Sequence, residues 1–142
     1  MSRGLNKVMV IGHVGRDPEM RYTPSGVPVT RFSVATNYVW TDAEGNQQKE
    51  TTWFRVSAWR RQAETCNQYL TKGSQVLIEG RLVPDRETGG PRVWTGNDGV
   101  ARASYELRAL TVKFLGGRME REEELPPDIP EEFGEEEDEI PF

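Results

Sequence analysis

The chain has 142 residues, which is enough for one domain, and hydrophobic residues make up only 35% of it, so part of the chain is expected to stay outside the core. The single cysteine, Cys66, excludes an internal disulfide and a cysteine-based metal site. No apolar run reaches the roughly 18 residues that a membrane span needs. The first residues also lack the apolar stretch of a signal peptide, so we expect a cytoplasmic protein.

The net charge of −5 hides an uneven distribution of charge along the chain. Residues 1–118 carry 17 Lys and Arg against 11 Asp and Glu, a net charge of +6, whereas residues 119–142 carry one basic and 12 acidic residues, a net charge of −11. A basic body joined to an acidic arm is typical of proteins that bind nucleic acid with the body and leave the arm solvated for other interactions.

The first half of the basic body is predicted to form three strands. Residues 7–14 are apolar and rich in β-branched side chains, and residues 27–38 alternate between apolar and polar side chains with a period of two. The turn-forming residues 42–46 predict a hairpin that leads into a third strand over residues 50–59.

The second half of the body begins with a short helix, predicted over residues 60–70 because Ala63, Cys66 and Leu70 recur at helical spacing. The remaining elements are a strand, a long loop rich in glycine and proline, and a last strand, expected over residues 74–83, 84–104 and 105–114. Gly116 and Gly117 end the domain.

This order of elements predicts an all-β fold. Three strands, one helix and two further strands are the layout of a five-stranded Greek-key barrel of the oligonucleotide-binding (OB) type. A β-sandwich would fit the strands almost as well, but the position of the helix argues against it. We expect the OB-fold domain to cover residues 1–116. Residues 117–142 are dominated by glutamate and proline, and their like charges and scarce apolar surface predict a disordered tail.

The third predicted strand carries the candidate binding face. Trp53, Arg55, Ser57 and Trp59 alternate onto one face, and the other face is apolar and suited to the core. Binding of single-stranded nucleic acid uses this combination, because unpaired bases stack on aromatic rings while cations neutralise phosphates. For an isolated tryptophan, packing in the core would be the commoner role. For Trp53 and Trp59 on one face with Arg55, we favour binding.

The other two tryptophans and several basic residues are further candidates. Trp40 stands at the base of the hairpin, where packing and binding are about equally plausible, and Trp94 stands in the polar loop, which favours a contact role. The residues that could contact phosphate are Arg60, Arg61, Lys72, Arg86 and Arg92. Each of them alone is more often a solvated surface charge, and only their joint excess in the body points to nucleic acid.

No group of side chains in the body supports catalysis. The only histidine, His13, has no evident partner, and no nucleophile has an evident base. Asp17 and Glu19 are too isolated to hold a metal ion, and no glycine-rich loop has the spacing that cradles phosphate. The sequence therefore predicts a protein that is not an enzyme and that needs no cofactor or metal. A nuclease would need clustered carboxylates or histidines, which the body lacks.

The last residues of the acidic tail predict a docking peptide. An acidic run is most often a solubilising segment, but Phe133, Ile140 and Phe142 are large apolar groups in this one. The ring and terminal carboxylate of Phe142, preceded by acidic residues, suit an apolar pocket rimmed with Arg or Lys. The predicted partner-binding tip consists of Asp138, Glu139, Ile140, Pro141 and Phe142. We also expect the tail to compete with DNA for the basic body.

Several segments resemble the bacterial single-stranded DNA-binding proteins of replication and repair. They are residues 2–8, 15–22, 69–76 and 78–82, together with the ending at residues 138–142. The resemblance spans about residues 2–115 plus the tip, and departs from the family pattern in the hairpin residues 41–43, which lack the positive charge often found there. An OB module for RNA is the main alternative, and the ending Ile140-Pro141-Phe142 argues against it.

The resemblance implies an OB fold that assembles as a homotetramer in the cytoplasm, associated with the nucleoid, with DNA wrapped around it. It implies that bases stack on Trp40, Trp53, Trp59 and Trp94. It implies phosphate contacts at Arg3, Lys7, Arg55, Arg61 and Lys72. The tip is implied to recruit enzymes of replication, recombination and repair.

Overall fold

The computed structural model describes residues 3–116, so the predicted disordered tail and its docking tip lie outside the described residues. Within this range the elements, in chain order, are β1 (Val8–Val14), β2 (Glu19–Tyr22), β3 (Pro28–Thr41), β4 (Gln47–Trp59), α1 (Arg61–Tyr69), β5 (Gln75–Leu82), β6 (Arg92–Thr95) and β7 (Ala101–Gly116). No helix among residues 3–116 is long and apolar enough to cross a membrane.

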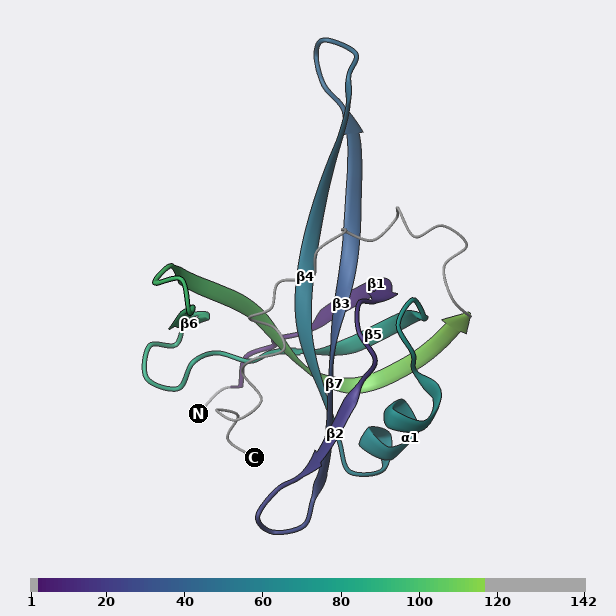
Figure 1. Ribbon diagram of the computed structural model, residues 1–142, viewed down its shortest axis with the longest axis vertical. Helices are drawn as coiled ribbons and strands as arrows, with labels where there is room; N and C mark the ends of the chain where they lie inside the picture. The colour runs from purple at the N-terminus through teal and green to yellow at the C-terminus, as the bar shows by residue number, and fades with distance from the viewer. Residues whose placement is uncertain (1–2, 117–142) are drawn as a thin grey trace.

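Five of the strands close into a barrel. Their hydrogen-bonded order is β1-β5-β7-β4-β3, and a short pairing that sets His13 opposite Ala35 joins β1 to β3 and closes the ring. The pair β4–β7 is parallel, and the other barrel pairs are antiparallel. The helix α1 connects β4 to β5 (Figure 1), and the Thr30 hydroxyl of β3 donates a hydrogen bond of 2.6 Å to its Ala63 carbonyl. A closed five-stranded barrel with one helix between its third and fourth strands confirms the predicted OB fold.

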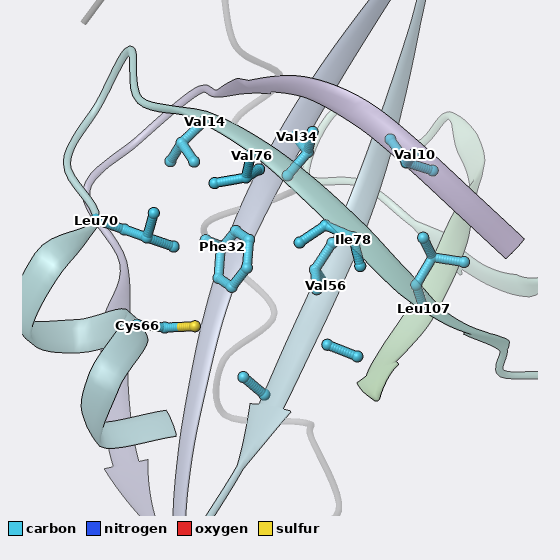
Figure 2. Close-up of a cluster of buried hydrophobic side chains, with 12 residues drawn as sticks. Val10, Val14, Phe32, Val34, Val56, Cys66, Leu70, Val76, Ile78 and Leu107 are labelled. Atoms are coloured by element: carbon cyan, nitrogen blue, oxygen red, sulfur yellow. The ribbon is translucent and has the colours of Figure 1, made fainter. Parts of the chain in front are cut away.

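Every barrel strand contributes to one apolar core, because alternate side chains of each strand point inward. Figure 2 shows the side chains that meet there, with Cys66 of α1 and Leu70, the residue after the helix, at one end. The fully buried strand residues include Val14, Val34, Val56, Val76, Ile78 and Leu107. Each such side chain stabilises the fold by roughly 1.5–3 kcal/mol relative to an exposed one.

Two glycines permit close approach of strands in the barrel. A Cβ atom at Gly12 of β1 would overlap the backbone oxygen of Ala35, and a Cβ atom at Gly80 of β5 would overlap the backbone oxygen of Arg108. Only a residue without a side chain fits where two backbones come this close. Gly12 therefore makes the closing contact between β1 and β3 possible.

Two short strands depart from the predicted elements. β2 follows the turn at Asp17 and pairs with β3, and β6 lies in the segment predicted to be a long loop and pairs with β7. The prediction of a loop over residues 84–104 is therefore wrong. Each of these strands has only four residues and pairs along the edge of a longer strand. Four residues are too few for a hydrophobic period to mark a strand in the sequence.

The strands β3 and β4 extend beyond the barrel as a long hairpin (Figure 1). At its turn the Asp42 carboxylate accepts hydrogen bonds of 2.9 Å from the backbone N–H groups of Asn46 and Glu44, and these bonds lower the pKa of Asp42. Both strands are longer than predicted, because the distal part of the hairpin is exposed and polar and gives no hydrophobic periodicity. The helix agrees with its predicted range to one residue at each end.

Candidate nucleic-acid interface

The outer face of β4 forms the centre of the candidate interface. Trp53, Arg55 and Trp59 alternate with the buried Val56 and Ala58, as the sequence predicts. The register continues this face onto β3, where Ala35, Ser33 and Arg31 stand opposite Trp53, Arg55 and Ser57, and onto β7, where Glu106 and Arg108 stand opposite Arg55 and Ser57. The structure thus gathers the predicted face on three adjacent strands.

Arg55 differs from the prediction, which placed it on a face that need not be buried. It is only 4% exposed, because the indole of Trp94 lies over it with 5.4 Å between the guanidinium carbon and the ring centroid. Trp94 stands on β6, and the β6–β7 hairpin carries it across the outer face of β4. Trp94, which the sequence placed in a polar loop, therefore stands on a strand and packs against Arg55. Arg55 and Trp94 form one cation–π pair in the middle of the face.

Trp53 packs on the backbone at the end of β1. A Cβ atom at Gly15 would lie 2.5 Å from Cζ3 and 2.7 Å from Cη2 of the indole, so the ring rests where Gly15 leaves space. The neighbouring small side chains of Ser33 and Ala35 on β3 are buried, and Ala35 stands directly opposite Trp53. The remaining ring surface borders a hollow of about 460 Å³ formed by residues 50–53 and 103–105. The lining of this hollow also includes Tyr105, which is 56% exposed and which the sequence did not single out.

Trp59 lies at the other end of the face and has a defined orientation. Its Nε1–H donates a hydrogen bond of 3.2 Å to the Ser57 hydroxyl, and the guanidinium carbon of Arg108 lies 4.5 Å from its ring centroid. The ring also borders a smaller hollow of about 120 Å³, whose lining includes Arg31 and Arg55. Arg31 and Arg108 were not among the predicted contacts. Their signal in the sequence is their alternation with apolar core residues along their strands.

Trp40 lies apart from the other tryptophans. In the unbroken pairing of β3 with β4, Ala35 of β3 stands opposite Trp53 of β4, so both side chains lie on one face. Trp40 follows Ala35 on β3 by an odd number of positions, so its side chain lies on the other face of the hairpin. There it is 38% exposed and its ring centroid lies 5.6 Å from that of Tyr38. The structure does not bring Trp40 together with Trp53 and Trp59.

The predicted phosphate-binding residues are spread over several elements. Arg3, Lys7, Arg60, Arg61, Lys72 and Arg86 are exposed, and Arg92 on β6 is half-buried. Lys7 forms a long ion pair of 3.8 Å with Glu79, and the backbone N–H of Lys72 donates a hydrogen bond of 2.9 Å to the Asp17 carboxylate. None of these basic residues lines either hollow of the face. The structure therefore leaves these basic residues on several elements and does not gather them in the two hollows.

The face has the chemistry of a binding surface. Among residues 3–116 no group of three or more His, Cys, Asp and Glu side chains is arranged to hold a metal ion. The thiol of Cys66 is buried in the core, and this burial raises its pKa to about 11, which keeps it in the unreactive protonated form at neutral pH. Aromatic rings with guanidinium groups beside them are suited to stack bases and to attract phosphates.

Comparison with known proteins identifies the family of the chain. The model of the single-strand binding protein family matches residues 5–115. A single-stranded DNA-binding protein of Neisseria meningitidis serogroup A is 44% identical over 116 residues, which are 82% of this chain and 63% of that protein. One from Chlorobaculum tepidum is 50% identical over 119 residues, 83% of this chain and 69% of that protein. The chain thus spans less than two thirds of the length of the Neisseria protein.

Solved structures agree with the sequence relatives. The Plasmodium falciparum single-stranded DNA-binding protein, solved in complex with single-stranded DNA, superposes with a TM-score of 0.65 at 28% identity, over 82% of this chain and 99% of that one. The wild-type Thermus aquaticus protein superposes with a TM-score of 0.60 at 32% identity, over 82% of this chain and 53% of that one. The chain belongs to the single-strand binding protein family.

Proposed function

We propose that this protein binds single-stranded DNA without sequence preference and without catalysis, and protects it during replication, recombination and repair. The observation that carries the proposal is the outer face of β4, where Trp53, Trp59 and Trp94 are gathered with Arg55 and Arg108. Relatives named as single-stranded DNA-binding proteins support the choice of ligand.

The physical basis of the proposed binding is stacking combined with phosphate neutralisation. An unpaired base stacked on an aromatic side chain contributes about 1–3 kcal/mol, and every base has a face that can stack, so the binding tolerates any sequence. The surrounding basic residues supply attraction that depends on salt. In duplex DNA the bases already stack on one another, so the same rings have nothing to bind.

The protein is also proposed to act as a homotetramer around which DNA wraps. Large apolar side chains are exposed on the outer surfaces of β1 and β7, including Met9, Ile11 and Leu110, each more than half exposed. Exposed apolar surface of this kind favours association with another chain. Sedimentation velocity of the free protein tests the proposal, which requires a mass of about four times the 16.2 kDa chain.

The tail is proposed to recruit partner enzymes through the tip formed by Asp138, Glu139, Ile140, Pro141 and Phe142. The support is the chemistry of the sequence, in which an aromatic ring and a terminal carboxylate follow a run of acidic residues. Phe142→Ala should abolish retention of a partner in a pull-down while leaving affinity for DNA unchanged. Retention of the same partner by the variant would contradict this role.

Competition binding distinguishes the proposed ligand from the alternatives. A labelled oligothymidylate bound to the protein should be displaced by unlabelled single-stranded DNA of any sequence, and only weakly by duplex DNA. More effective displacement by an RNA of matched sequence would favour an OB module for RNA. Shortening of the labelled strand in the presence of Mg²⁺ would contradict the absence of catalysis.

A further inference from the structure

We infer that Trp59 and Arg108 form one nucleotide subsite, in which a base stacks on the Trp59 ring and Arg108 holds the adjacent phosphate. Arg108 lies over the ring, and the base is assigned to the ring surface that borders the hollow of about 120 Å³. This inference rests on the proposed binding of single-stranded DNA. It adds a contact residue from the last strand, which the sequence pattern did not single out.

The geometry fixes both groups from the same pair of strands. The guanidinium carbon of Arg108 lies 4.5 Å from the centroid of the Trp59 ring. Arg108 stands directly opposite Ser57 in the parallel pairing of β4 and β7, and the Ser57 hydroxyl accepts the hydrogen bond from the indole of Trp59 at 3.2 Å. The ring and the cation are therefore held by a paired strand segment and not by a loop.

The chemistry of a stacked guanidinium suits a phosphate. When a guanidinium lies against an aromatic ring, its N–H donors remain at the edge of its plane and can bind an anion in two-point fashion. No carboxylate of residues 3–116 forms an ion pair with Arg108. A phosphate at this edge would stand next to a base stacked on the indole, so the two side chains contact the two parts of one nucleotide.

The position of Trp59 connects this subsite to the rest of the face. The ring borders the hollow of about 120 Å³ that Arg31 and Arg55 also line. A DNA strand that passes along this hollow meets the Trp59 ring and the guanidinium groups of Arg31 and Arg55, with Glu106 as the acidic residue of the lining. The opposite possibility is that Arg108 only covers the ring and must leave when a base stacks. That alternative predicts that removal of Arg108 tightens binding.

The experiment compares variants in their affinity for an oligothymidylate of about 10 nucleotides, a length within the range that one OB fold occupies. Binding is measured between about 50 and 200 mM salt, and the thermal midpoint of each variant is recorded. Arg108→Gln should weaken binding about tenfold, the loss that follows removal of one hydrogen bond to a charged group. It should also make the plot of log K against log salt shallower by about 0.7, the value for one phosphate contact on a single strand.

Two further variants make the result specific. Arg108→Lys keeps the charge and should retain the salt slope while losing part of the affinity, since an ammonium group does not stack or bind in two-point fashion. Lys113→Gln is the matched control, because it removes the same charge from the same strand. Lys113 is exposed on β7 and lines neither hollow. This variant should leave affinity within about twofold of the parent and the salt slope almost unchanged, because exposed charges contribute little.

The outcomes separate this inference from the proposed function. Arg108→Gln binding that equals that of Lys113→Gln, or that is tighter than that of the parent, would overturn the subsite. Weaker binding with an unchanged salt slope would also overturn it, because it would reveal a structural role without a phosphate contact. Failure of the parent protein to bind the oligomer at all would instead refute the proposed function.

Discussion

The indole of Trp94 lies over the guanidinium of Arg55, with 5.4 Å between the guanidinium carbon and the ring centroid. The two residues stand on β6 and β4, and β7 lies between these strands and pairs with both. The contact therefore shows that the β6–β7 hairpin folds over the outer face of the barrel. A charge held under a ring is fixed in place, so we expect Arg55 to position Trp94 and to strengthen its stacking with a base.

Trp94→Ala should weaken binding of single-stranded DNA by about 1–3 kcal/mol, the contribution of one stacked base. The variant loses the ring and also exposes Arg55, which gains access to phosphate and moderates the loss. Fluorescence anisotropy of a labelled oligothymidylate measures the change. Val93→Ala is the control, since Val93 is an exposed neighbour on the same strand. Equal affinity of the Trp94 variant and its control would show that this ring only covers Arg55.

Gly15→Ala should disturb the interface through Trp53. The new Cβ atom would lie 2.5 Å from the indole, closer than any real contact, so the ring must shift. We expect about tenfold weaker binding together with a modest fall in the thermal midpoint. Gly4→Ala serves as the control, because a Cβ atom there meets nothing within 4 Å. Normal affinity in Gly15→Ala would mean that the position of the Trp53 ring does not matter for DNA.

Trp40→Ala should weaken binding without changing its salt dependence. The distal hairpin, residues 41–50, carries three acidic residues, Asp42, Glu44 and Glu50, and one basic residue, Lys49. Its net negative charge repels phosphate, so we expect Trp40 to contribute by stacking alone. Because Trp40 lies on the other face of the hairpin from Trp53, the loss should appear with oligomers long enough to reach both faces and be small with short ones. A change in the salt slope on removal of Trp40 would contradict this assignment.

Deletion of residues 119–142 should tighten DNA binding, most visibly at low salt. The segment carries a net charge of −11 against +6 for residues 1–118, and attraction between them is screened as salt is added. Affinity for an oligothymidylate is compared for the full chain, the deletion, and a chain of full length whose acidic tail residues are replaced by their amides. If the amide variant and the full chain bind the oligothymidylate with equal affinity at low salt, the charge of the tail does not compete with DNA for the basic body.

The pH dependence of stability should show the burial of Cys66. Burial raises the pKa of its thiol from 9.0 to about 11, so the folded state disfavours the thiolate. The stabilisation is fully present below pH 9, the ordinary value, and is lost as the pH rises from there towards 11. Urea denaturation across this range should show a falling free energy of unfolding, and Cys66→Ala should reduce the slope. An equal slope in the variant would assign the loss to other groups.

The sequence predicted those features of the fold that depend on local alternation. The period of two in the third predicted strand assigned its apolar face to the core, and the structure confirms this, since Val56 and Ala58 of β4 are buried. The same period placed Trp53, Arg55 and Trp59 on one face, which the register confirms. These predictions succeeded because a strand sends successive side chains to opposite faces, whatever its partners are.

The sequence did not predict features that depend on which strands are neighbours. Arg108 contacts Trp59 only because β7 pairs in parallel with β4, and Trp94 reaches Arg55 only because β6 pairs with β7. The two contacts join segments far apart along the chain, so no local pattern signals them. The position of Trp40 on the other face of the hairpin from Trp53 depends on the pairing register of β3 and β4, which the sequence left open.

The most direct test of the proposed function is a titration of the intrinsic tryptophan fluorescence with oligothymidylate at stepped salt concentrations. All four tryptophans of the chain are candidate stacking platforms, so stacked bases should quench the emission, and the affinity should fall linearly on a plot of log K against log salt. Emission that stays constant as the oligomer is added, at every salt concentration, would contradict the binding of single-stranded DNA by this face.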